Sequence, residues 1–484
     1  MPDADRNRPI TSAHPRTKTE IRASLQNKPQ MPLRDRFTSA TFKLKQVVFR
    51  RSAVSAYRQL IKNQFLTTEE VAALNWRKRK AIVSHAYERV PYYRGAFRRA
   101  GFHPDQLLSP EDWVRVPILT RADLAAGFKQ LIADDADRRR LTLSTTGGST
   151  GEPVSVFLDR RFPLETLAWR MITWWGLAPG IDCAYSWRLL RRTRLTRMLN
   201  AALWWPTQRI WLDASDLSER SCGRFLAQFN TLKPALLQGY VGAIQELAEY
   251  VERTRTPVHS PSAVWLTASP IPITTRSLVE RVFRAPVYDQ YGSCETPWLA
   301  AECRLHDGLH IFSDAAHIDF VTEDGDPSVS GTPGRVLVTD LENKAFPLIR
   351  YANGDIGCAQ LGACPCGLPF PLMRPVQGRV TERILLPDGT AIAGEYLTTL
   401  FDAFPDAVVS FQVLQHADYS VTLRFVPNQA CPNSAEALDT VTRNLLKVLK
   451  SSVPVSACPV AATESDRGKL RCVKSEAHRS VRAS

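Results

Sequence analysis

The spacing of apolar residues changes along the chain, and the changes predict a layered α/β region followed by a strand-rich one. Short apolar runs predict strands at residues 208–212, 235–237, 263–266 and 285–288. Between them, residues 218–232 and 241–253 have the apolar spacing of amphipathic helices. Because strands that alternate with helices build layered sheets, this part of the chain is predicted to be an α/β core.

The N-terminal part of the chain is predicted to be mostly helical. Residues 41–100 have helical character, and Pro91 ends a helix that runs through His85. Residues 116–119 form a short strand-like run, and Thr120 is placed to open a helix. Residues 1–40 hold several prolines and polar residues and are expected to be a mobile basic leader.

The pattern changes to strands and turns after residue 309. Apolar runs at residues 310–312, 317–321 and 334–339 predict a β subdomain, and Gly378-Arg379 is a candidate hinge. We therefore expect a large layered α/β domain with a β subdomain over residues 41–377. A small, mobile α+β lid domain is expected over residues 378–484.

The positive charge is concentrated near the N-terminus. The 484 residues carry a net charge of +14, but residues 1–100 alone hold 22 Lys/Arg and 7 Asp/Glu. Such a region can contact an anionic membrane or an acidic partner, or it can simply be solvated. No nucleic-acid-binding motif accompanies it, so we do not expect nucleic acid as a partner.

The composition predicts a folded cytoplasmic protein. Apolar residues make up 44% of the chain, and no apolar run of about 18 residues predicts a membrane span. Residues 1–30 are polar and lack the apolar segment of a secretory signal. The ten cysteines are scattered rather than arranged in a small-domain disulfide pattern, which fits a reducing compartment.

The stretch from Ser144 to Pro153 is a candidate phosphate-binding loop. It combines three glycines with four hydroxyl side chains from Thr145 onward, and an alternating strand-like run follows it. Glycines let backbone amides approach an anion closely, and hydroxyl groups add donors. The loop lacks the Gly-Lys-Ser/Thr ending of a Walker A motif, so the usual NTPase interpretation is disfavoured. A surface turn is the alternative.

Four further segments follow this loop in order: Tyr291-Gly-Ser-Cys-Glu295, Arg350-Tyr-Ala-Asn-Gly-Asp355, Gly378-Arg379 and Gly468-Lys469-Leu-Arg471. Together with the loop, the ordered set resembles the adenylate-forming superfamily over roughly residues 60–475. The likeness is strongest to the branch that contains phenylacetate–coenzyme A ligase, coenzyme F390 synthetase and capsule-biosynthesis adenylating proteins. His85-Ala-Tyr-Glu-Arg-Val-Pro-Tyr-Tyr-Arg and Asp289-Gln-Tyr-Gly-Ser also point to this branch.

The resemblance implies ATP binding and Mg²⁺-dependent adenylation of a carboxylic acid. Glu295 is expected to help hold Mg²⁺, and Asp355 to accept hydrogen bonds from the ribose hydroxyls. Lys469 is expected to serve the adenylation step, and Arg379 to contact the nucleotide near the hinge. The remaining nucleotide-binding residues implied are Thr145, Thr146, Gly147, Gly148, Ser149, Thr150, Gly151, Tyr291, Gly292 and Ser293.

The chain departs from the superfamily pattern at two places. Val154 and Ser155 stand where many members carry a lysine, and Thr381-Glu382 stands where an Asp pair commonly follows the hinge. The resemblance places the acid pocket beside Tyr240, Ala268 and Gly292. Small and aromatic walls there would suit an aromatic or small apolar acid.

A cluster of cysteines is a candidate structural zinc site. The resemblance favours Cys303, His310, Cys364 and Cys366, because three thiolates and one imidazole suit a closed tetrahedral Zn²⁺. His306 is the rival fourth ligand, and unrelated reduced thiols are the alternative.

The leading hypothesis is therefore an AMP-forming ligase that passes an activated acid to coenzyme A. One alternative keeps the adenylation step but transfers the acid to a carrier protein or an amine in polysaccharide or secondary-metabolite synthesis. The other alternative is a non-catalytic nucleotide-binding scaffold. The basic N-terminal region leaves peripheral membrane contact open.

Overall fold

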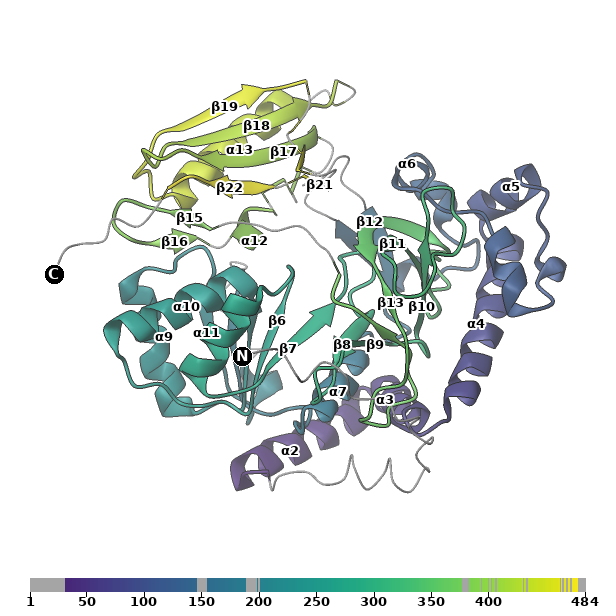
Figure 1. Cartoon of the computed structure of the whole chain (residues 1–484), viewed down its shortest axis with the longest axis horizontal. Coiled ribbons are helices and arrows are strands. Elements are labelled where there is room, and N and C mark those ends of the chain that lie inside the picture. The colour runs from purple at the N-terminus through teal and green to yellow at the C-terminus, as the bar shows by residue number, and fades with distance from the viewer. Residues whose placement is uncertain are drawn as a thin grey trace, which may run out of the picture.

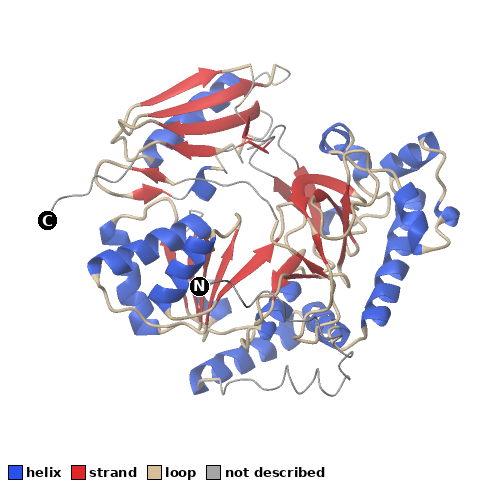
Figure 2. Ribbon diagram, viewed as in Figure 1, coloured by secondary structure: helices blue, strands red, loops and turns tan. Residues whose placement is uncertain are grey.

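A computed structural model of the chain shows a mixed α/β protein (Figures 1 and 2). It describes residues 31–145, 155–188, 198, 201–376, 383–392, 394–398, 400–401, 403–404, 407–429, 431, 434–461, 463, 465–466, 469–470 and 472–477. The N-terminal helices are α2 Leu33–Phe49, α3 Arg51–Asn63, α4 Thr68–Arg89, α5 Pro91–Arg99 and α6 Arg121–Ala126. The later helices are α7 Glu165–Trp174, α9 Glu219–Leu232, α10 Val241–Thr254, α11 Ile273–Phe283, α12 Gly394–Leu397 and α13 Ser434–Val448.

The central sheet has nine strands in the order β13-β14-β9-β8-β7-β6-β5-β3-β4. Its parallel part consists of β3 Cys183–Trp187, β4 Arg209–Asp213, β5 Leu236–Tyr240, β6 Ala263–Thr267 and β7 Val287–Tyr291. The antiparallel extension consists of β8 Ala300–Glu302, β9 Leu309–Ile311, β13 Ala359–Gln360 and β14 Leu372–Met373. The four strands predicted in this region are confirmed to within a few residues, whereas β3 was not predicted.

Helices cover both faces of the parallel strands, which explains why those strands are largely buried. In β6, Val264 and Leu266 pack with α9, α10 and α11, while Ala263 and Trp265 face the cluster that contains α7. The helices predicted at residues 218–232 and 241–253 are confirmed as α9 and α10. Ser218 caps α9 by accepting a hydrogen bond from the backbone of Ser221.

The β subdomain is a three-stranded antiparallel sheet of β10 Ala316–Val321, β11 Gly334–Asp340 and β12 Tyr351–Gly357. A hairpin of β1 Leu141–Thr145 and β2 Ser155–Asp159 flanks the candidate phosphate-binding loop. The strand-like run at residues 116–119 is reduced to a single bridge between Leu119 and Tyr351. Thr120 opens α6 as predicted, with a reciprocal cap to Asp123.

The C-terminal part forms a separate sheet in Figure 1 and has a hydrophobic core of its own. Its four-stranded sheet contains β17 Val408–Gln415, β18 Val421–Pro427, β19 Val455–Pro459 and β22 Val473–Ser475. Small pairs are formed by β15 Ile384–Leu385 with β16 Ala391–Ile392, and by β20 Ser465–Asp466 with β21 Lys469–Leu470. Arg383 joins this part to α10 through Glu246 and Glu249, at 2.8 and 2.7 Å.

The N-terminal helices begin at Leu33, earlier than the residue 41 predicted from the sequence. Pro91 ends α4 as predicted, and it also occupies the first turn of α5, where its missing N–H costs nothing. None of the described helices is long and apolar enough to cross a membrane.

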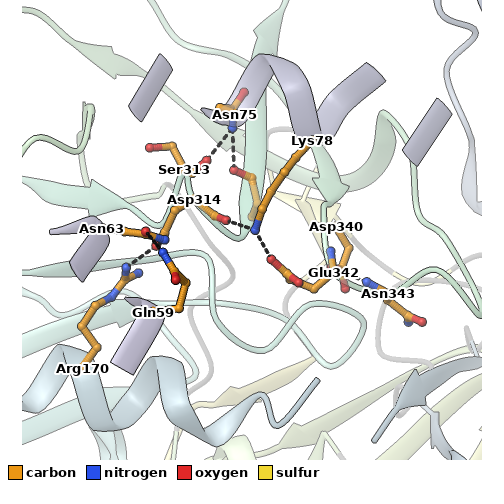
Figure 3. Close-up of polar contacts among 11 residues, drawn as sticks. Gln59, Asn63, Asn75, Lys78, Arg170, Ser313, Asp314, Asp340, Glu342 and Asn343 are labelled. Carbon is orange, nitrogen blue, oxygen red and sulfur yellow. Dashed lines mark hydrogen bonds and ion pairs between the residues drawn. The ribbon is translucent and has the colours of Figure 1, made fainter. Parts of the chain in front are cut away.

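A buried polar network holds these helices to the sheets (Figure 3). The carboxylate of Asp314 accepts hydrogen bonds from Arg170 of α7 at 2.6 Å and from Asn63 of α3 at 2.9 Å. Lys78 of α4 donates to the Asp314 carbonyl at 2.7 Å and pairs with Glu342. Arg170 and Asp314 are both fully buried, so each charge depends on the other for compensation.

Replacing Arg170 with alanine should therefore lower the free energy of unfolding by about 3–5 kcal/mol, because Asp314 would be left buried without its cation. The midpoint of urea unfolding measures the effect. Arg253→Ala removes an exposed pair with Glu219 and is the matched control, with an expected cost below about 1 kcal/mol. Equal midpoints for the two variants would contradict the prediction.

Candidate active site

The candidate site lies where the end of β7 meets β12. Tyr291 is the last residue of β7, and its hydroxyl donates to Oδ2 of Asp355 at 2.9 Å. Asn353 donates to the same carboxylate oxygen at 3.0 Å and to the Tyr291 hydroxyl at 2.7 Å. Strand β12, which contains Asp355, thus fixes the orientation of its carboxylate.

A tight turn after β7 presents Glu295. Ser293 and Thr296 bond to each other through backbone and side chain, at 3.0 and 3.1 Å. Gly292 is required here, because a Cβ at this position would lie 2.0 Å from the Pro297 carbonyl oxygen. A side chain at position 292 would therefore collide with the backbone of the same turn.

Glu295 is buried between two polar side chains that sequence reasoning did not assign to the site. The Tyr351 hydroxyl donates to its carboxylate at 3.1 Å, and Arg121 at the start of α6 lies 3.9 Å away. Arg121 follows the helix-opening Thr120, but the sequence gives no sign of its long-range partner. Burial, followed by the charge of Glu295, raises the pKa of Tyr351 far above its usual value, so this phenol stays a donor.

The hairpin around the candidate phosphate-binding loop rests against the same turn. Ser144 donates to the carbonyl of Cys294 at 3.1 Å, and the hydroxyls of Thr145 and Ser155 lie 3.1 Å apart. The loop-side end of β1 is therefore placed against the turn that presents Glu295, and β2 is joined to it there. The predicted loop residues Thr146, Gly147, Gly148, Ser149, Thr150 and Gly151 lie outside the described residues, as does Arg379.

Lys469 lies in β21, which pairs with β20 through Asp466. The structure describes the backbone of Lys469, and its side chain lies outside the described part of the chain.

Two of the predicted acid-pocket residues end neighbouring strands of the sheet. Tyr240 ends β5 and stacks on Trp187 of β3, with ring centroids 4.2 Å apart. Ala268 follows β6 with a φ of 77°, an unusual conformation for a residue with a Cβ. Both lie at the carboxyl edge of the parallel strands, where α/β proteins commonly bind ligands. The tyrosine–tryptophan stack was not predicted.

Arg350 has a structural position rather than one in the site. Its guanidinium is buried, donates to the carbonyls of Val114 and Val116 at 2.6 and 2.8 Å, and lies 3.7 Å from Asp319. It therefore anchors the start of β12 to the segment that leads to α6.

The four predicted zinc ligands converge in the core beside α7. Their ligand atoms all lie within 4.8 Å of one another, and every one of the four residues is buried. Cys303 and Cys364 sulfurs are 3.7 Å apart, and His310 Nε2 lies 3.4 Å from the sulfur of Cys366. Hydrogen bonds from the other two thiols lower the pKa of Cys364.

The rival ligand His306 has other partners. Its Nδ1 lies 3.1 Å from Glu302, and its ring stacks on Tyr288. The Nδ1 of His310, by contrast, faces the carbonyl of Phe370 at 3.3 Å, which leaves Nε2 directed at the sulfurs. A backbone carbonyl that accepts the other ring N–H is the usual way to orient a metal-binding imidazole.

Comparison with solved structures identifies the fold. A 2-hydroxyisobutyryl-CoA ligase in complex with 2-HIB-AMP and CoA matches with a TM-score of 0.59 and 19% identity, covering 86% of this chain and 91% of that one. The same ligase in its postadenylation state matches with a TM-score of 0.55 and 18% identity, covering 85% and 90%. At this identity the likeness establishes the mixed α/β fold.

Sequence comparison identifies relatives. No family model matches the chain. A phenylacetate-coenzyme A ligase of Thermus thermophilus is 25% identical over 360 residues, which are 72% of this chain and 79% of the relative. The Escherichia coli phenylacetate-coenzyme A ligase is 26% identical over 301 residues, or 60% and 67%. The resemblance to the adenylate-forming superfamily is confirmed. The relatives named above are both phenylacetate-coenzyme A ligases, which is one of the groups in the predicted branch.

Within this adenylate-forming fold, Asp289 of β7 is a buried acid next to the site. Burial, together with the like charge of Glu302, raises the pKa of Asp289 to about 7, although Arg276 opposes the shift. The folded protein therefore keeps this proton to higher pH than the unfolded chain does. The stability that results is complete below about pH 4 and is lost as the pH rises through about 7.

Asp289→Asn should remove this pH dependence, because an amide does not titrate. The variant should therefore gain melting temperature relative to the wild type as the pH rises from 4 to 8. The corresponding gain in unfolding free energy is at most about 4 kcal/mol, because each pKa unit corresponds to about 1.4 kcal/mol. Differential scanning fluorimetry measures it, with the exposed turn variant Asp324→Asn as control. A difference that stays constant with pH would contradict the assignment.

Proposed function

We propose that the chain is an AMP-forming acid–coenzyme A ligase. The observation that carries this proposal is the convergence of Glu295, Asp355 and the base of the 145–155 hairpin around the end of β7. These groups come from three separate segments, and their types match what adenylation needs. The relatives, named as phenylacetate-coenzyme A ligases, and a structural neighbour bound to an acyl-AMP and CoA support the same reaction class.

The proposed reaction has two steps. The carboxylate of the acid attacks the α-phosphate of ATP, pyrophosphate leaves, and the acyl-AMP forms. The thiol of coenzyme A then attacks the acyl carbonyl, and AMP leaves. Because negative charge gathers on phosphate oxygens in the first step, preorganised donors and cations give the largest stabilisation.

Each residue role follows from its chemistry. Asp355, held by Tyr291 and Asn353, is proposed to accept hydrogen bonds from the ribose hydroxyls. Glu295 is proposed to hold Mg²⁺, which would neutralise phosphate charge, and its carboxylate is the hard oxygen ligand that this ion prefers. Arg121 is then a neighbouring cation that contacts the same carboxylate.

The acid is proposed to lie beside Tyr240 and Ala268. The stacked rings of Tyr240 and Trp187 give this position an aromatic wall, which suits a flat, apolar acid. Transfer to a carrier protein or an amine uses the same first step. Only the identity of the acceptor that reacts with the acyl-AMP distinguishes these alternatives from transfer to coenzyme A.

We also propose that residues 378–484 act as a lid that carries Lys469. Their separate core supports a unit that can move as one body. In the arrangement described, Arg383 pairs with Glu246 and Glu249 of α10, and a rotation of the lid would exchange these contacts.

Acid-dependent exchange of pyrophosphate into ATP, measured across a panel of aromatic and small aliphatic acids, tests the proposal. Lys469→Ala should lower the exchange rate by at least about 100-fold, the cost of losing one preorganised transition-state donor. Lys474→Ala, a lysine of the nearby strand β22, is the matched control and should keep near-normal exchange. Absence of exchange with every acid would favour the scaffold alternative.

We further propose that Cys303, His310, Cys364 and Cys366 hold one structural zinc ion. The donor set fits, because three sulfurs and an oriented imidazole nitrogen are the groups that Zn²⁺ binds in closed tetrahedral sites. The site joins β9 to the Cys364–Cys366 turn, far apart in sequence, so zinc would stabilise the sheet extension rather than enter the reaction.

Protein purified without added metal should contain about one zinc per chain, because a buried four-ligand site binds the ion tightly. Metal analysis by mass spectrometry measures the ratio. Cys364→Ser should lose the metal and lower the melting temperature, while Cys458→Ser, an exposed thiol elsewhere, should change neither. Wild-type protein without stoichiometric zinc would refute the assignment.

A further inference from the structure

Helix α2 has its apolar residues on the wrong side for a helix that packs on a globular core. Its buried positions are Asp35, Thr38, Ser39 and Phe42, three of them polar. Six of its large apolar side chains are instead exposed: Leu33, Phe37, Leu44, Val47, Val48 and Phe49. Leu33 is 80% exposed and Leu44 64% exposed. A surface helix normally shows the reverse arrangement, so this face is built to contact something else.

Four of these exposed apolar residues, Leu33, Phe37, Leu44 and Val48, form a stripe along α2. Positions 33, 37, 44 and 48 are separated by four, seven and four residues, which places them along one side of the helix. The stripe extends toward a neighbouring segment, where Leu203 and Trp205 are each 63% exposed. Lys45 ties that segment to α2, because its ammonium donates to the carbonyls of Leu203, at 3.2 Å, and Trp205.

Basic residues are concentrated in α2 and α3, where Arg34 pairs with Asp182 and Arg50 with Glu165. Residues 33–63, which form α2 and α3, contain eight Lys/Arg and a single acid, the buried Asp35. A surface groove of about 390 Å³ lies between the end of α2 and one face of α3. Arg51, Arg58 and Lys62 line it together with Val47, Val54 and Ser55, and no acidic residue does.

Charge decides which occupant fits this surface. A second copy of the chain would bring an equally positive face against it, and residues 1–30 carry six Lys/Arg and only three acids. An anionic lipid surface complements both features at once, since acyl chains take the stripe and phosphates take the cations. Exposed tryptophan at the edge of the stripe is also typical of a membrane interface.

We propose that α2 and α3 dock the protein on membranes that contain anionic phospholipids. Helix α2 lies in the interface with Leu33, Phe37, Leu44 and Val48 among the acyl chains. The groove beside α3 binds a lipid phosphate between Arg51, Arg58 and Lys62. The two valines that line the groove contact the acyl chain of the same lipid. Helices α2 and α3 lie at the end of the molecule opposite the C-terminal sheet (Figure 1). Docking therefore leaves the lid and the site facing the aqueous side.

Flotation of the full chain with lipid vesicles tests the proposal. We expect binding to vesicles of equal parts phosphatidylcholine and phosphatidylglycerol, weak binding to pure phosphatidylcholine, and loss of binding as salt is raised. Inorganic phosphate should not release the protein, because it offers nothing to the apolar stripe. Binding that is equal on neutral and anionic vesicles, or absent on both, would overturn the proposal.

Two variants assign the binding to this surface. Leu44→Ser/Val48→Ser should reduce vesicle affinity at least about tenfold by removing buried acyl contacts. Arg58→Ala/Lys62→Ala should reduce both the affinity and its dependence on salt. These side chains are exposed, so the melting temperature should be unchanged, and Val329→Ser on a distant turn is the control.

Other outcomes would count against a lipid partner. A concentration-dependent dimer that Leu44→Ser/Val48→Ser abolishes would assign the stripe to a second copy. Binding to polyglutamate but not to anionic vesicles would assign it to an acidic protein. Pyrophosphate exchange is measured without vesicles, so failure of the proposed ligase activity and failure of membrane docking are separate results.

Discussion

The carboxylate of Asp314 is the point on which the arrangement of the N-terminal helices depends. It is fully buried between the central sheet and the helices, and Arg170 and Asn63 satisfy it from two different helices. A buried charge of this kind tolerates few alternative arrangements, because any other packing would leave it without a compensating partner. Lys78 extends the same network to Glu342, so α3, α4 and α7 are all positioned against the β subdomain.

That positioning also determines the candidate site. Once α4 and α5 are packed against the segment around Ile349, the start of β12 is fixed, and Arg350 anchors it further. Strand β12 can then bring Tyr351 and Asp355 to the end of β7, where Glu295 and Tyr291 lie. The site is thus an interface between two sheets, and neither sheet alone supplies its carboxylates and their donors.

The two proposed functions use different parts of the molecule. The C-terminal part lies at one end, whereas the basic surface of α2 and α3 lies at the other (Figure 1). The cysteine–histidine cluster sits between them in the sheet extension, beside Trp174 of α7. A ligase held on a membrane by its N-terminal helices could still exchange soluble nucleotide and thiol at its free end.

The sequence by itself determined the features that are local. Apolar spacing predicted β4–β7, α9 and α10, and capping chemistry at Thr120 predicted α6, because these signals act over a few residues. The ordered motifs also predicted the likeness to the adenylate-forming superfamily, and the cysteine pattern predicted the residues that converge in the cysteine–histidine cluster. Only the tertiary structure decided that Arg121 and Tyr351 meet Glu295, that His310 rather than His306 points at the sulfurs, and that Asp355 lies inside a strand. It also decided that the apolar side of α2 faces outward. These outcomes depend on contacts between residues tens to hundreds of positions apart, and a periodicity read along one helix cannot tell which of its faces the rest of the chain will cover.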